Sequence, residues 1–316
     1  MKTIRIQDGM EFPAPCVATI GFFDGVHLGH QYLIEHVVAE AKTSGMESTV
    51  ITFDEHPRKV LQSDYIPQML CTFDSKLLLL SKTEIDNCAV LHFDKDMQNL
   101  SAREFMQKIL RDRLNVKKLV IGYDNRFGHN RSEDFEDYVR YGKELGIEVI
   151  HNQAFTLNGC KVSSSVVRRY IEGGEIELAN QCLGYPYTIA GKVVEGYQEG
   201  RKLGYPTANL DTSCLEQLVP SPGVYAVKVS MEQDGEGHEA MMNIGTRPTF
   251  GGTEQSLEVH IFNFDENIYG KKIFVSFLHR IREEHKFETV DDLKEQLRQD
   301  ERLVEQQFDK EKKNYE

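Results

Sequence analysis

The sequence predicts two modules of different fold class, a doubly wound α/β module with a parallel sheet and then an antiparallel β-barrel with a terminal helix. Its 316 residues, at roughly 150 per domain, fit two domains. Up to about residue 183, short apolar runs alternate with segments of helical periodicity, which is the pattern of βαβ units. From residue 184 on, strand-like runs follow one another directly. The predicted modules are therefore residues 1–183 and 184–316, with the boundary within residues 173–185.

In the first module, apolar runs mark the candidate strands at residues 17–22, 49–53, 89–93, 118–122 and 147–151. The segment after the first strand places apolar side chains on one face at helical spacing, namely Leu33, Ile34, Val37, Val38 and Ala41. Ser101 and Glu104 form a capping box that is expected to open a second helix. Ser132, which is followed by acidic residues, is expected to open another.

In the second module, runs bounded by Gly, Pro and Asp turns mark the candidate strands at residues 187–195, 224–231, 240–244, 257–264 and 273–281. No helix is expected among these strands. Helical periodicity returns after Thr289, through Leu293, Leu297, Val304 and Phe308. An antiparallel barrel with one C-terminal helix is the architecture that fits this pattern.

The charge and composition of the chain exclude several classes of protein. Thirty-seven basic residues against fifty acidic ones give a formal net charge of −13, so no nucleic-acid partner is expected. No run approaches the ~18 apolar residues of a membrane span, and the first residues lack the apolar core of a signal peptide. Six cysteines form no CxxC pair, which favours reduced, packed thiols. We expect a cytoplasmic protein that acts on small molecules; nothing in the sequence indicates its oligomeric state.

The first strand of the α/β module runs into residues 21–30, GFFDGVHLGH, and a helix follows at once. Glycines in this loop allow close approach of a ligand, and a helix N-terminus attracts phosphate. Two histidines three residues apart, His27 and His30, could both direct ring nitrogens toward one phosphate and help to neutralise charge that develops during transfer. An isolated HxGH is short enough to arise by chance, and capping or surface histidines are then the alternative.

Further polar segments follow other predicted strands of this module. They are DEHPR at residues 54–58, GYDNRFGHNR at residues 122–131 and VSSSVVR at residues 162–168, the last at the start of a helix. Because the strands are predicted to be parallel, these segments should converge on one side of the sheet.

The segments GFFDGVHLGH, GYDNRFG and SSSVVR together resemble the nucleotidyltransferase module of the bifunctional prokaryotic riboflavin kinase/FAD synthetase family. The resemblance implies a Rossmann-like HxGH fold that transfers AMP from ATP to FMN and releases pyrophosphate. By motif match, His27 and His30 would be catalytic and contact the ATP phosphates. The residues that would bind ATP or its phosphates are Gly25, Gly29, Ser164, Ser165 and Arg168, while Asp124 and Asn125 would lie in a flavin or nucleotide loop.

The sequence departs from that family pattern at two positions. Asn125 replaces an aromatic residue, which removes a stacking surface, and Ser165 stands where Thr is more common but keeps the hydroxyl. Asp24 could organise the loop or a Mg²⁺ site, but a turn or N-cap role is an equal alternative, so it stays outside the predicted catalytic set.

In the second module, residues 196–210 read GYQEGRKLGYPTANL. Gly200 and Arg201 fit a tight loop around phosphate, and Thr207 and Asn209 offer the hard oxygen ligands that Mg²⁺ accepts. Read alone, this stretch is better interpreted as a plain connection between strands. Glu258 lies in the alternating segment LEVHIF, opposite the apolar face, where an acid is usually just solvated.

Four segments, GRKLGYPTAN, NIGTRPTFGG, LEVHIF and the YG at residues 269–270, resemble the riboflavin kinase module of the same family. The resemblance implies that Glu258 is the general base that accepts the riboflavin 5′-hydroxyl proton, and that Thr207 and Asn209 carry Mg²⁺. Arg282 and Phe287 also match a family stretch, although a surface ion-pair cluster and a helix-anchoring Phe are the simpler interpretation.

These observations predict a bifunctional enzyme that phosphorylates riboflavin to FMN and adenylylates FMN to FAD, using ATP and Mg²⁺ or another divalent cation in both steps. Two alternatives remain open at this point. Only one module could be active, or the chain could be a flavin- or RNA-associated regulator that keeps the folds for binding. The carboxylate at Glu258 favours an enzyme, and the acidic charge argues against RNA.

Overall fold

The computed structural model describes residues 1–7, 12, 14–56, 68–123, 125–129, 133–196, 199–249 and 252–314. The chain divides into two compact units. The first consists of Met1–Pro67 and Phe73–Ser163, and the second of Gln68–Thr72 and Ser164–Glu316. Each unit has its own sheet, and the two are described separately.

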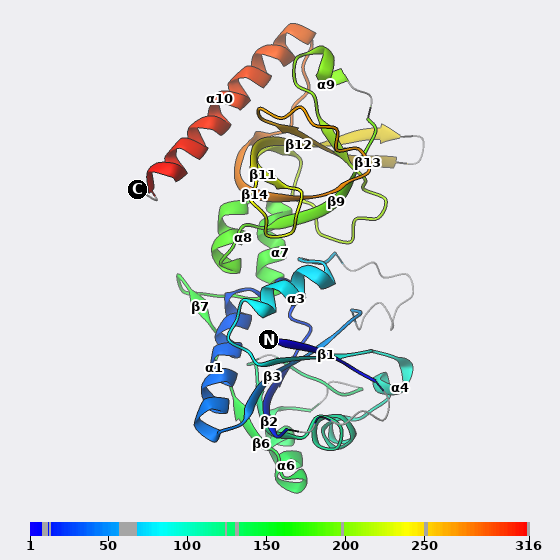
Figure 1. Cartoon of the computed structure of the whole chain (residues 1–316), viewed down its shortest axis with the longest axis vertical. Helices are drawn as coiled ribbons and strands as arrows, with labels where there is room; N and C mark the ends of the chain where they lie inside the picture. Colours follow the sequence, from blue (N-terminus) through cyan, green and yellow to red (C-terminus); the bar gives the residue numbers. More distant parts are fainter. Residues whose placement is uncertain are drawn as a thin grey trace. The chain divides into compact units, whose positions relative to one another are not determined.

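The sheet of the first unit is six-stranded and parallel throughout, in the order β1-β4-β3-β2-β5-β6 (Figure 1). Its strands are β1 (Lys2–Ile6), β2 (Cys16–Ile20), β3 (Glu47–Phe53), β4 (Asn87–Leu91), β5 (Val116–Ile121) and β6 (Glu148–His151). The predicted doubly wound sheet is confirmed. β1 was not predicted, because its sequence KTIRI alternates polar and apolar residues at the sheet edge and lacks the apolar run of a buried strand.

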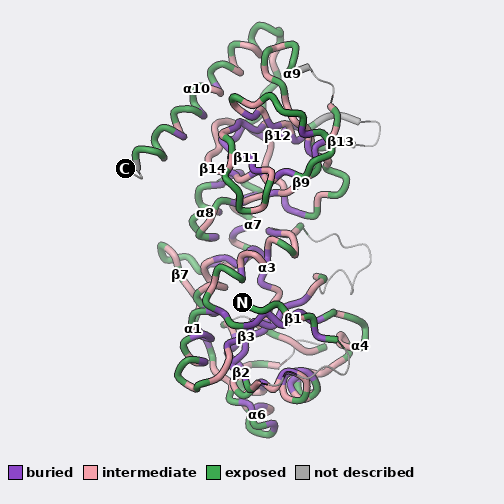
Figure 2. Tube along the Cα trace, viewed as in Figure 1, coloured by how far each residue is buried: buried purple, intermediate pink, exposed green. Residues whose placement is uncertain are grey.

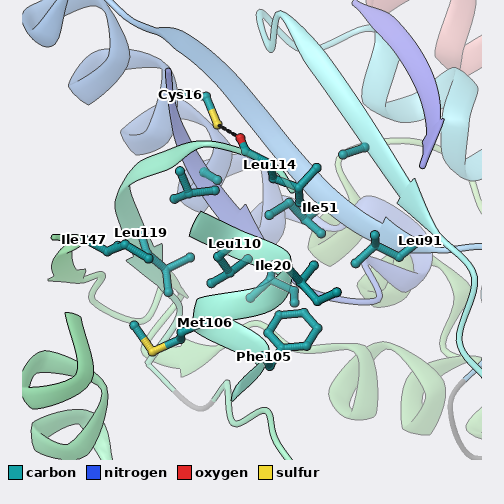
Figure 3. Packing of buried hydrophobic residues seen from close by; sticks show 14 of the residues in the cluster. Cys16, Ile20, Ile51, Leu91, Phe105, Met106, Leu110, Leu114, Leu119 and Ile147 are labelled. Atoms are coloured by element: carbon teal, nitrogen blue, oxygen red, sulfur yellow. Dashed lines mark hydrogen bonds between the residues drawn. The ribbon is translucent and has the colours of Figure 1, made fainter. Parts of the chain in front are cut away.

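Helices cover both faces of this sheet. On one face lie α1 (Leu28–Ser44) and α3 (Phe73–Ser81), whose buried residues pack with Val17, Val50 and Val90. On the other face, α5 (Ala102–Phe105) continues into a π-helical turn, Met106–Arg111. Figure 3 shows Phe105, Met106 and other side chains of this segment against the sheet, where the Cys16 thiol donates to the Leu114 carbonyl. Among the described residues of the unit, the other helices are the 3₁₀ turn Asp24–Val26, α4 (Lys95–Gln98) and α6 (Phe135–Leu145).

The structure confirms one of the two predicted helix starts of the first module. The capping box of Ser101 and Glu104 is present and opens α5, as predicted. The start predicted at Ser132 is wrong: α6 begins at Phe135, with Asp134 as N-cap and Asp137 completing a capping box, and Ser132 itself lies outside the described residues. Two carboxylates placed three residues apart satisfy the first backbone N–H groups of α6.

The second unit is built around a closed antiparallel barrel in the order β10-β13-β12-β11-β14-β9 (Figure 1). The strands are β9 (Thr188–Val194), β10 (Ala208–Leu210), β11 (Gly223–Ser230), β12 (His238–Thr249), β13 (Gly252–Ile261) and β14 (Lys272–Glu283). The predicted barrel is confirmed. The prediction that no helix lies among the strands is wrong, because α9 (Glu199–Lys202) forms one turn between β9 and the unpredicted β10.

Three further helices belong to the second unit, α7 (Ser164–Gly173), α8 (Ile176–Leu183) and the long C-terminal α10 (Val290–Asn314). The predicted helix after Thr289 is confirmed. Val304 and Phe308 of α10 are buried against Ala226 and Met241 of the barrel, and Figure 2 shows buried positions along the barrel strands and on this helix.

A short segment that precedes most of the first unit in sequence is part of the second unit. Met69 donates its N–H to the Glu216 carbonyl at 2.9 Å, and the Leu218 N–H donates to the Met69 carbonyl at 2.9 Å. Met69 and Gln217 thus form a parallel bridge. The second unit is therefore discontinuous in sequence.

Candidate active sites

The first candidate site lies at the switch point of the parallel sheet. Strand order reverses at β2, which has β3 on one side and β5 on the other. Ligands of open α/β sheets bind beyond the carboxyl ends of the strands at such a point. The HxGH loop follows β2 and residues 122–129 follow β5, so two of the predicted loops begin there.

His27 and His30 meet at the N-terminus of α1. His27 is the N-cap, and its Nδ1 accepts a hydrogen bond from the backbone N–H of His30 at 3.2 Å. The two imidazole rings stack with centroids 3.7 Å apart. At Gly29 a Cβ atom would lie 2.9 Å from the Val162 carbonyl oxygen, so a side chain there would push this contact apart. The predicted histidine pair is thus placed at a helix start that suits a phosphate.

The turn before these histidines has an unusual backbone. Phe23, Gly25 and Val26 have φ angles of 56°, 75° and 35°. For a β-branched residue such as Val26, a positive φ is a genuine outlier. Conformations of this kind persist only where the surrounding structure fixes them, and they concentrate at functional sites.

The surroundings of the His30 ring disfavour its protonated form. Its Nδ1 is shielded from solvent and has no hydrogen-bond partner within the described residues. Burial lowers the pKa of His30 well below its usual value, and the nearby His27 and Lys76 lower it further. To a phosphate that binds here, His30 therefore offers a hydrogen bond rather than the positive charge that the motif suggested.

The loops that follow β2, β3 and β5 contact one another, as the parallel strands predicted. The Asn125 side-chain amide donates to the Ile20 carbonyl at the end of β2. The ring of His56 meets Phe22 edge to face at 4.7 Å. Asn125 thus tethers the loop after β5 in place of the aromatic stacking surface. Pro57, Arg58, Asp124, Asn130 and Arg131 of the predicted segments lie outside the described residues.

Ser164, Ser165 and Arg168, from the predicted segment VSSSVVR, lie on α7 and belong to the second unit. Arg168 donates from Nε to the Gln68 carbonyl at 3.2 Å within that unit. The placement of Ser164, Ser165 and Arg168 at the ATP phosphates stays a prediction. The preceding residue Val162, which is in the first unit, reaches Gly29 as described above.

The second candidate site is a cavity of about 420 Å³ beside the barrel. Glu258 of β13 lies directly opposite Asn209 of β10 and Asn243 of β12 in the strand register. The Thr207 hydroxyl donates to the Glu258 carboxylate at 3.4 Å. The predicted face is confirmed, since Leu257 and Val259 are buried in the barrel while Glu258 lines the cavity. A carboxylate with a hydroxyl and two amides around it can accept a proton and can share a cation.

A second cavity of about 450 Å³ adjoins the first through Thr207, which lines both. Arg201 lines it together with Phe264 and Tyr269. Gly200 lines the first cavity, and a Cβ on Gly200 would lie only 2.3 Å from the Tyr205 carbonyl oxygen. Gly200 and Arg201 lie on the helical turn α9, not in an irregular loop, and they line different cavities.

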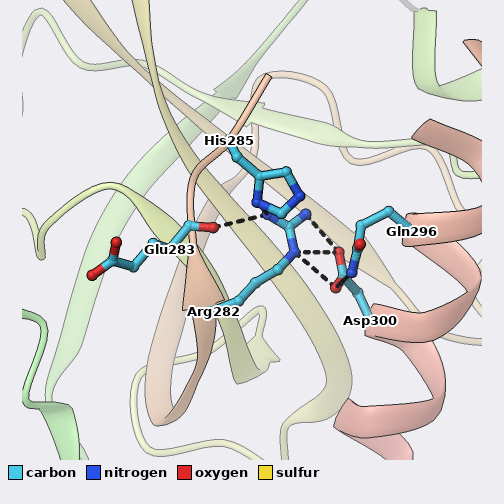
Figure 4. A network of polar contacts seen from close by, with 5 residues as sticks. All are labelled: Arg282, Glu283, His285, Gln296 and Asp300. Atoms are coloured by element: carbon cyan, nitrogen blue, oxygen red, sulfur yellow. Dashed lines mark hydrogen bonds and ion pairs between the residues drawn. The ribbon is translucent and has the colours of Figure 1, made fainter. Parts of the chain in front are cut away.

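Sequence reasoning missed part of the cavity that contains Glu258, where the polar network of Figure 4 lies. Arg282 donates two hydrogen bonds to the Asp300 carboxylate of α10, from Nε at 2.9 Å and from Nη2 at 2.7 Å. Gln296 also donates to this carboxylate, at 2.9 Å. The surface interpretation of Arg282 is wrong, because its side chain is 18% exposed and that of Asp300 only 1%. Arg282, Asp300 and Phe287 all line the cavity. Asp300 sits among charged residues in the sequence, but it shares the buried face of α10 with Val304 and Phe308, four and eight residues further on.

Replacing Asp300 with alanine is expected to destabilise the second unit by about 3–5 kcal/mol, since it leaves the Arg282 guanidinium without its carboxylate. Urea unfolding followed by circular dichroism measures this loss. The matched control is Glu295→Ala, one turn earlier on α10, where an exposed pair with Arg298 should be worth at most ~1 kcal/mol. Equal losses in the two variants would contradict a buried ion pair.

Three properties of the described residues bear on chemistry and location. Within this part of the chain, no helix combines the length and apolar character needed to cross a bilayer. No cluster of three or more His, Cys, Asp or Glu side chains that could hold a metal occurs among these residues. All six cysteines, each of them described, are unbridged thiols, and four are buried.

A parallel-sheet unit with an HxGH helix start, joined to a barrel with a carboxylate beside hydroxyl and amide oxygens, defines a transferase that acts on nucleotide phosphates. Family models match both parts of the chain, "FAD synthetase" over residues 10–166 and "Riboflavin kinase" over residues 183–308. The chain belongs to the bifunctional riboflavin kinase/FMN adenylyltransferase family. It phosphorylates riboflavin to FMN with ATP and adenylylates FMN to FAD.

Relatives match along most of the chain. The bifunctional riboflavin kinase/FMN adenylyltransferase of Haemophilus influenzae is 39% identical over 285 residues, which are 90% of this chain and 92% of the relative. That of Escherichia coli K12 is 37% identical over 306 residues, 95% and 96% of the two chains. A crystal structure from Streptococcus pneumoniae, described as a macrolide-efflux protein, has 33% identity, a TM-score of 0.86 and coverage of 96% and 99%. The predicted family and both predicted activities are confirmed, in preference to the alternatives of a single active module or a regulator.

Proposed function

We propose that residues 184–316 carry the riboflavin kinase reaction and residues 1–183 the FMN adenylyltransferase reaction. The observation that supports the first assignment most directly is the position of Glu258, between Asn209 and Asn243 and within reach of the Thr207 hydroxyl. Two other acids, Glu284 and Asp300, line this cavity among its described residues. Asp300 is paired with Arg282.

In the kinase step, Glu258 acts as the general base. It accepts the 5′-hydroxyl proton of riboflavin while that oxygen forms a bond to the γ-phosphorus of ATP, and the bond from this phosphorus to the β-phosphate oxygen breaks to release ADP. Riboflavin occupies the cavity that contains Glu258, and ATP occupies the adjoining cavity beside Arg201. Thr207, which lines both, lies where the two substrates meet.

A divalent cation fits the residues at this junction. Thr207 and Asn209 supply a hydroxyl and an amide oxygen, which are hard ligands, and Mg²⁺ usually completes its shell with waters and substrate phosphates. They would hold the ion beside Glu258, and the ion would neutralise charge on the β- and γ-phosphates.

In the adenylylation step, the FMN phosphate attacks the α-phosphorus of ATP directly and pyrophosphate leaves. His27, His30 and the backbone of Gly25 and Gly29 hold the ATP phosphates at the start of α1. Asp124 and Asn125 belong to the loop beside the flavin or nucleotide. No protein nucleophile takes part, so catalysis consists of positioning and charge stabilisation.

Removing the amide of Asn209 is expected to raise the Mg²⁺ concentration needed for half-maximal FMN formation by roughly 10–100-fold, the usual cost of disturbing a metal site. The assay incubates Asn209→Ala with riboflavin, ATP and graded Mg²⁺, and separates FMN from FAD by chromatography. FAD formation from supplied FMN in the same preparation is the internal control and should keep its metal dependence. An unchanged Mg²⁺ requirement for FMN formation would remove Asn209 from the metal site.

A further inference from the structure

A buried lysine lies beneath the HxGH loop of the first unit. Lys76, on α3, is only 2% exposed. Its ammonium donates to the Phe22 carbonyl at 3.1 Å, the Thr52 hydroxyl at 3.2 Å and the Phe53 carbonyl at 2.9 Å. It also lies 4.0 Å from the centroid of the Phe22 ring.

These contacts join three separate elements. Phe22 follows β2, Thr52 and Phe53 end β3, and Lys76 comes from α3. Burying an ammonium is costly unless good hydrogen bonds replace its water, and these three acceptors provide such bonds for its N–H donors. The ammonium therefore ties α3 to the carboxyl ends of two neighbouring strands at the switch point of the sheet.

The Phe22 carbonyl is the place where this tie reaches the active-site loop. It accepts from both Lys76 and the Thr52 hydroxyl, the latter at 3.1 Å. The next residues are the left-handed turn from Phe23 to Val26, which leads directly to the His27 cap. A strained turn needs fixed ends to persist, and Lys76 fixes the end nearer β2.

The charge of Lys76 also acts on His30. The titratable groups that lower the pKa of His30 are His27, from the same helix start, and Lys76, from α3, in addition to burial itself. Phe23 packs its ring edge to face with His30 at 5.1 Å and contributes no charge. Lys76 therefore adds a fixed positive charge near a ring whose protonated form is disfavoured.

We propose that Lys76 is a positioning residue of the FMN adenylyltransferase site, which holds the HxGH loop in place through the Phe22 carbonyl and keeps a permanent positive charge beside His30. The proposal rests on the assignment of adenylyl transfer to the first unit. Lys76 acts through the loop and through its field, and needs no direct contact with the reacting atoms.

The first test is Lys76→Met, which keeps the length and apolar stem of the side chain but removes the ammonium. We expect FAD formation from FMN to fall roughly 100-fold in kcat, the scale of a displacement of about 1 Å at a reacting site, with FMN formation from riboflavin unchanged. The matched control is Lys42→Met in the same unit, whose 70%-exposed side chain pairs with Glu84 at the surface. Control-level FAD formation in a folded Lys76→Met protein would overturn the proposal.

The second readout is the pH dependence of FAD formation, which a purely structural role would leave unchanged. Loss of the Lys76 charge removes one cause that lowers the His30 pKa, so this pKa rises toward its usual value of about 6.5. The acid limb of the kcat/KM profile for FMN should then move to higher pH. Lys76→Arg keeps the charge but not the fit, so its acid limb should stay in place while kcat falls; it also serves if Lys76→Met does not fold.

An acid limb that stays at the wild-type pH in Lys76→Met, or that moves as far in Lys76→Arg, would overturn the electrostatic part of the proposal. Wild-type kcat in Lys76→Arg would overturn the positioning part. If His30→Ala spares FAD formation in the otherwise wild-type protein, the assignment of the first unit fails; if His30→Ala abolishes it and the Lys76 variants behave as wild type, only the present inference fails.

Discussion

Glu258→Gln is expected to stop FMN formation from riboflavin while FAD formation from supplied FMN continues at the wild-type rate. An amide cannot take up the hydroxyl proton, and loss of a general base costs about 10²–10⁴-fold in rate. The amide oxygen can still accept from Thr207, so the loss reports on chemistry rather than folding. Initial rates of the two reactions, measured separately by chromatography of FMN and FAD, check this result.

The matched control for this variant is Glu283→Gln, at the end of β14. Glu283 is exposed, and Figure 4 shows its side chain directed away from Arg282. This control should keep both activities. If Glu258→Gln impaired both reactions equally in a folded protein, the assignment of separate reactions to the two parts of the chain would be wrong.

His30→Ala should have the opposite effect, with FAD formation from FMN reduced about 10²–10³-fold and FMN formation from riboflavin retained. The factor is that of removing one preorganised hydrogen-bond donor from a developing charge. His36→Ala, further along α1, is the control, since His36 only bonds the Asn152 side chain at 2.7 Å. The same two assays check the result. Retention of FAD formation in His30→Ala would exclude the HxGH loop as the adenylyl-transfer site.

Much of the fold could be read from sequence because its strongest signals are local. The buried strands β2, β3, β4 and β5 are continuous apolar runs, and their parallel order follows from the helical segments between them. The two strands that were missed lack such a signal: β1 is an alternating edge strand, and β10 has three residues inside a glycine-containing loop. Barrel closure brings β10 into place, and closure is a property of the whole sheet.

Site residues that belong to a sequence motif could be predicted, whereas charged residues that belong to a site because they are buried were missed. Glu258 could be placed on the cavity side of β13 by alternation alone. Lys76 and Asp300 were missed, because charged residues are rarely buried. A usable signal existed for Lys76: it lies one helical turn before Leu80, which is fully buried, so both share the inner face of α3. The same signal existed for Asp300, which lies one helical turn before the fully buried Val304 on α10, although its partner Arg282 comes from a distant strand.

The bridge between Met69 and Gln217 has a consequence for how these two enzymes can be separated or fused. A chain that starts at residue 184 contains every residue assigned to the kinase chemistry, yet it lacks the strand segment that donates to Glu216 and accepts from Leu218. Without that segment, the Glu216 carbonyl and the Leu218 N–H would hydrogen-bond to water instead, at a cost of about 0.5–1.5 kcal/mol for each lost bond. A kinase barrel cut out of this chain at residue 184 therefore needs another partner for the backbone groups of Glu216 and Leu218.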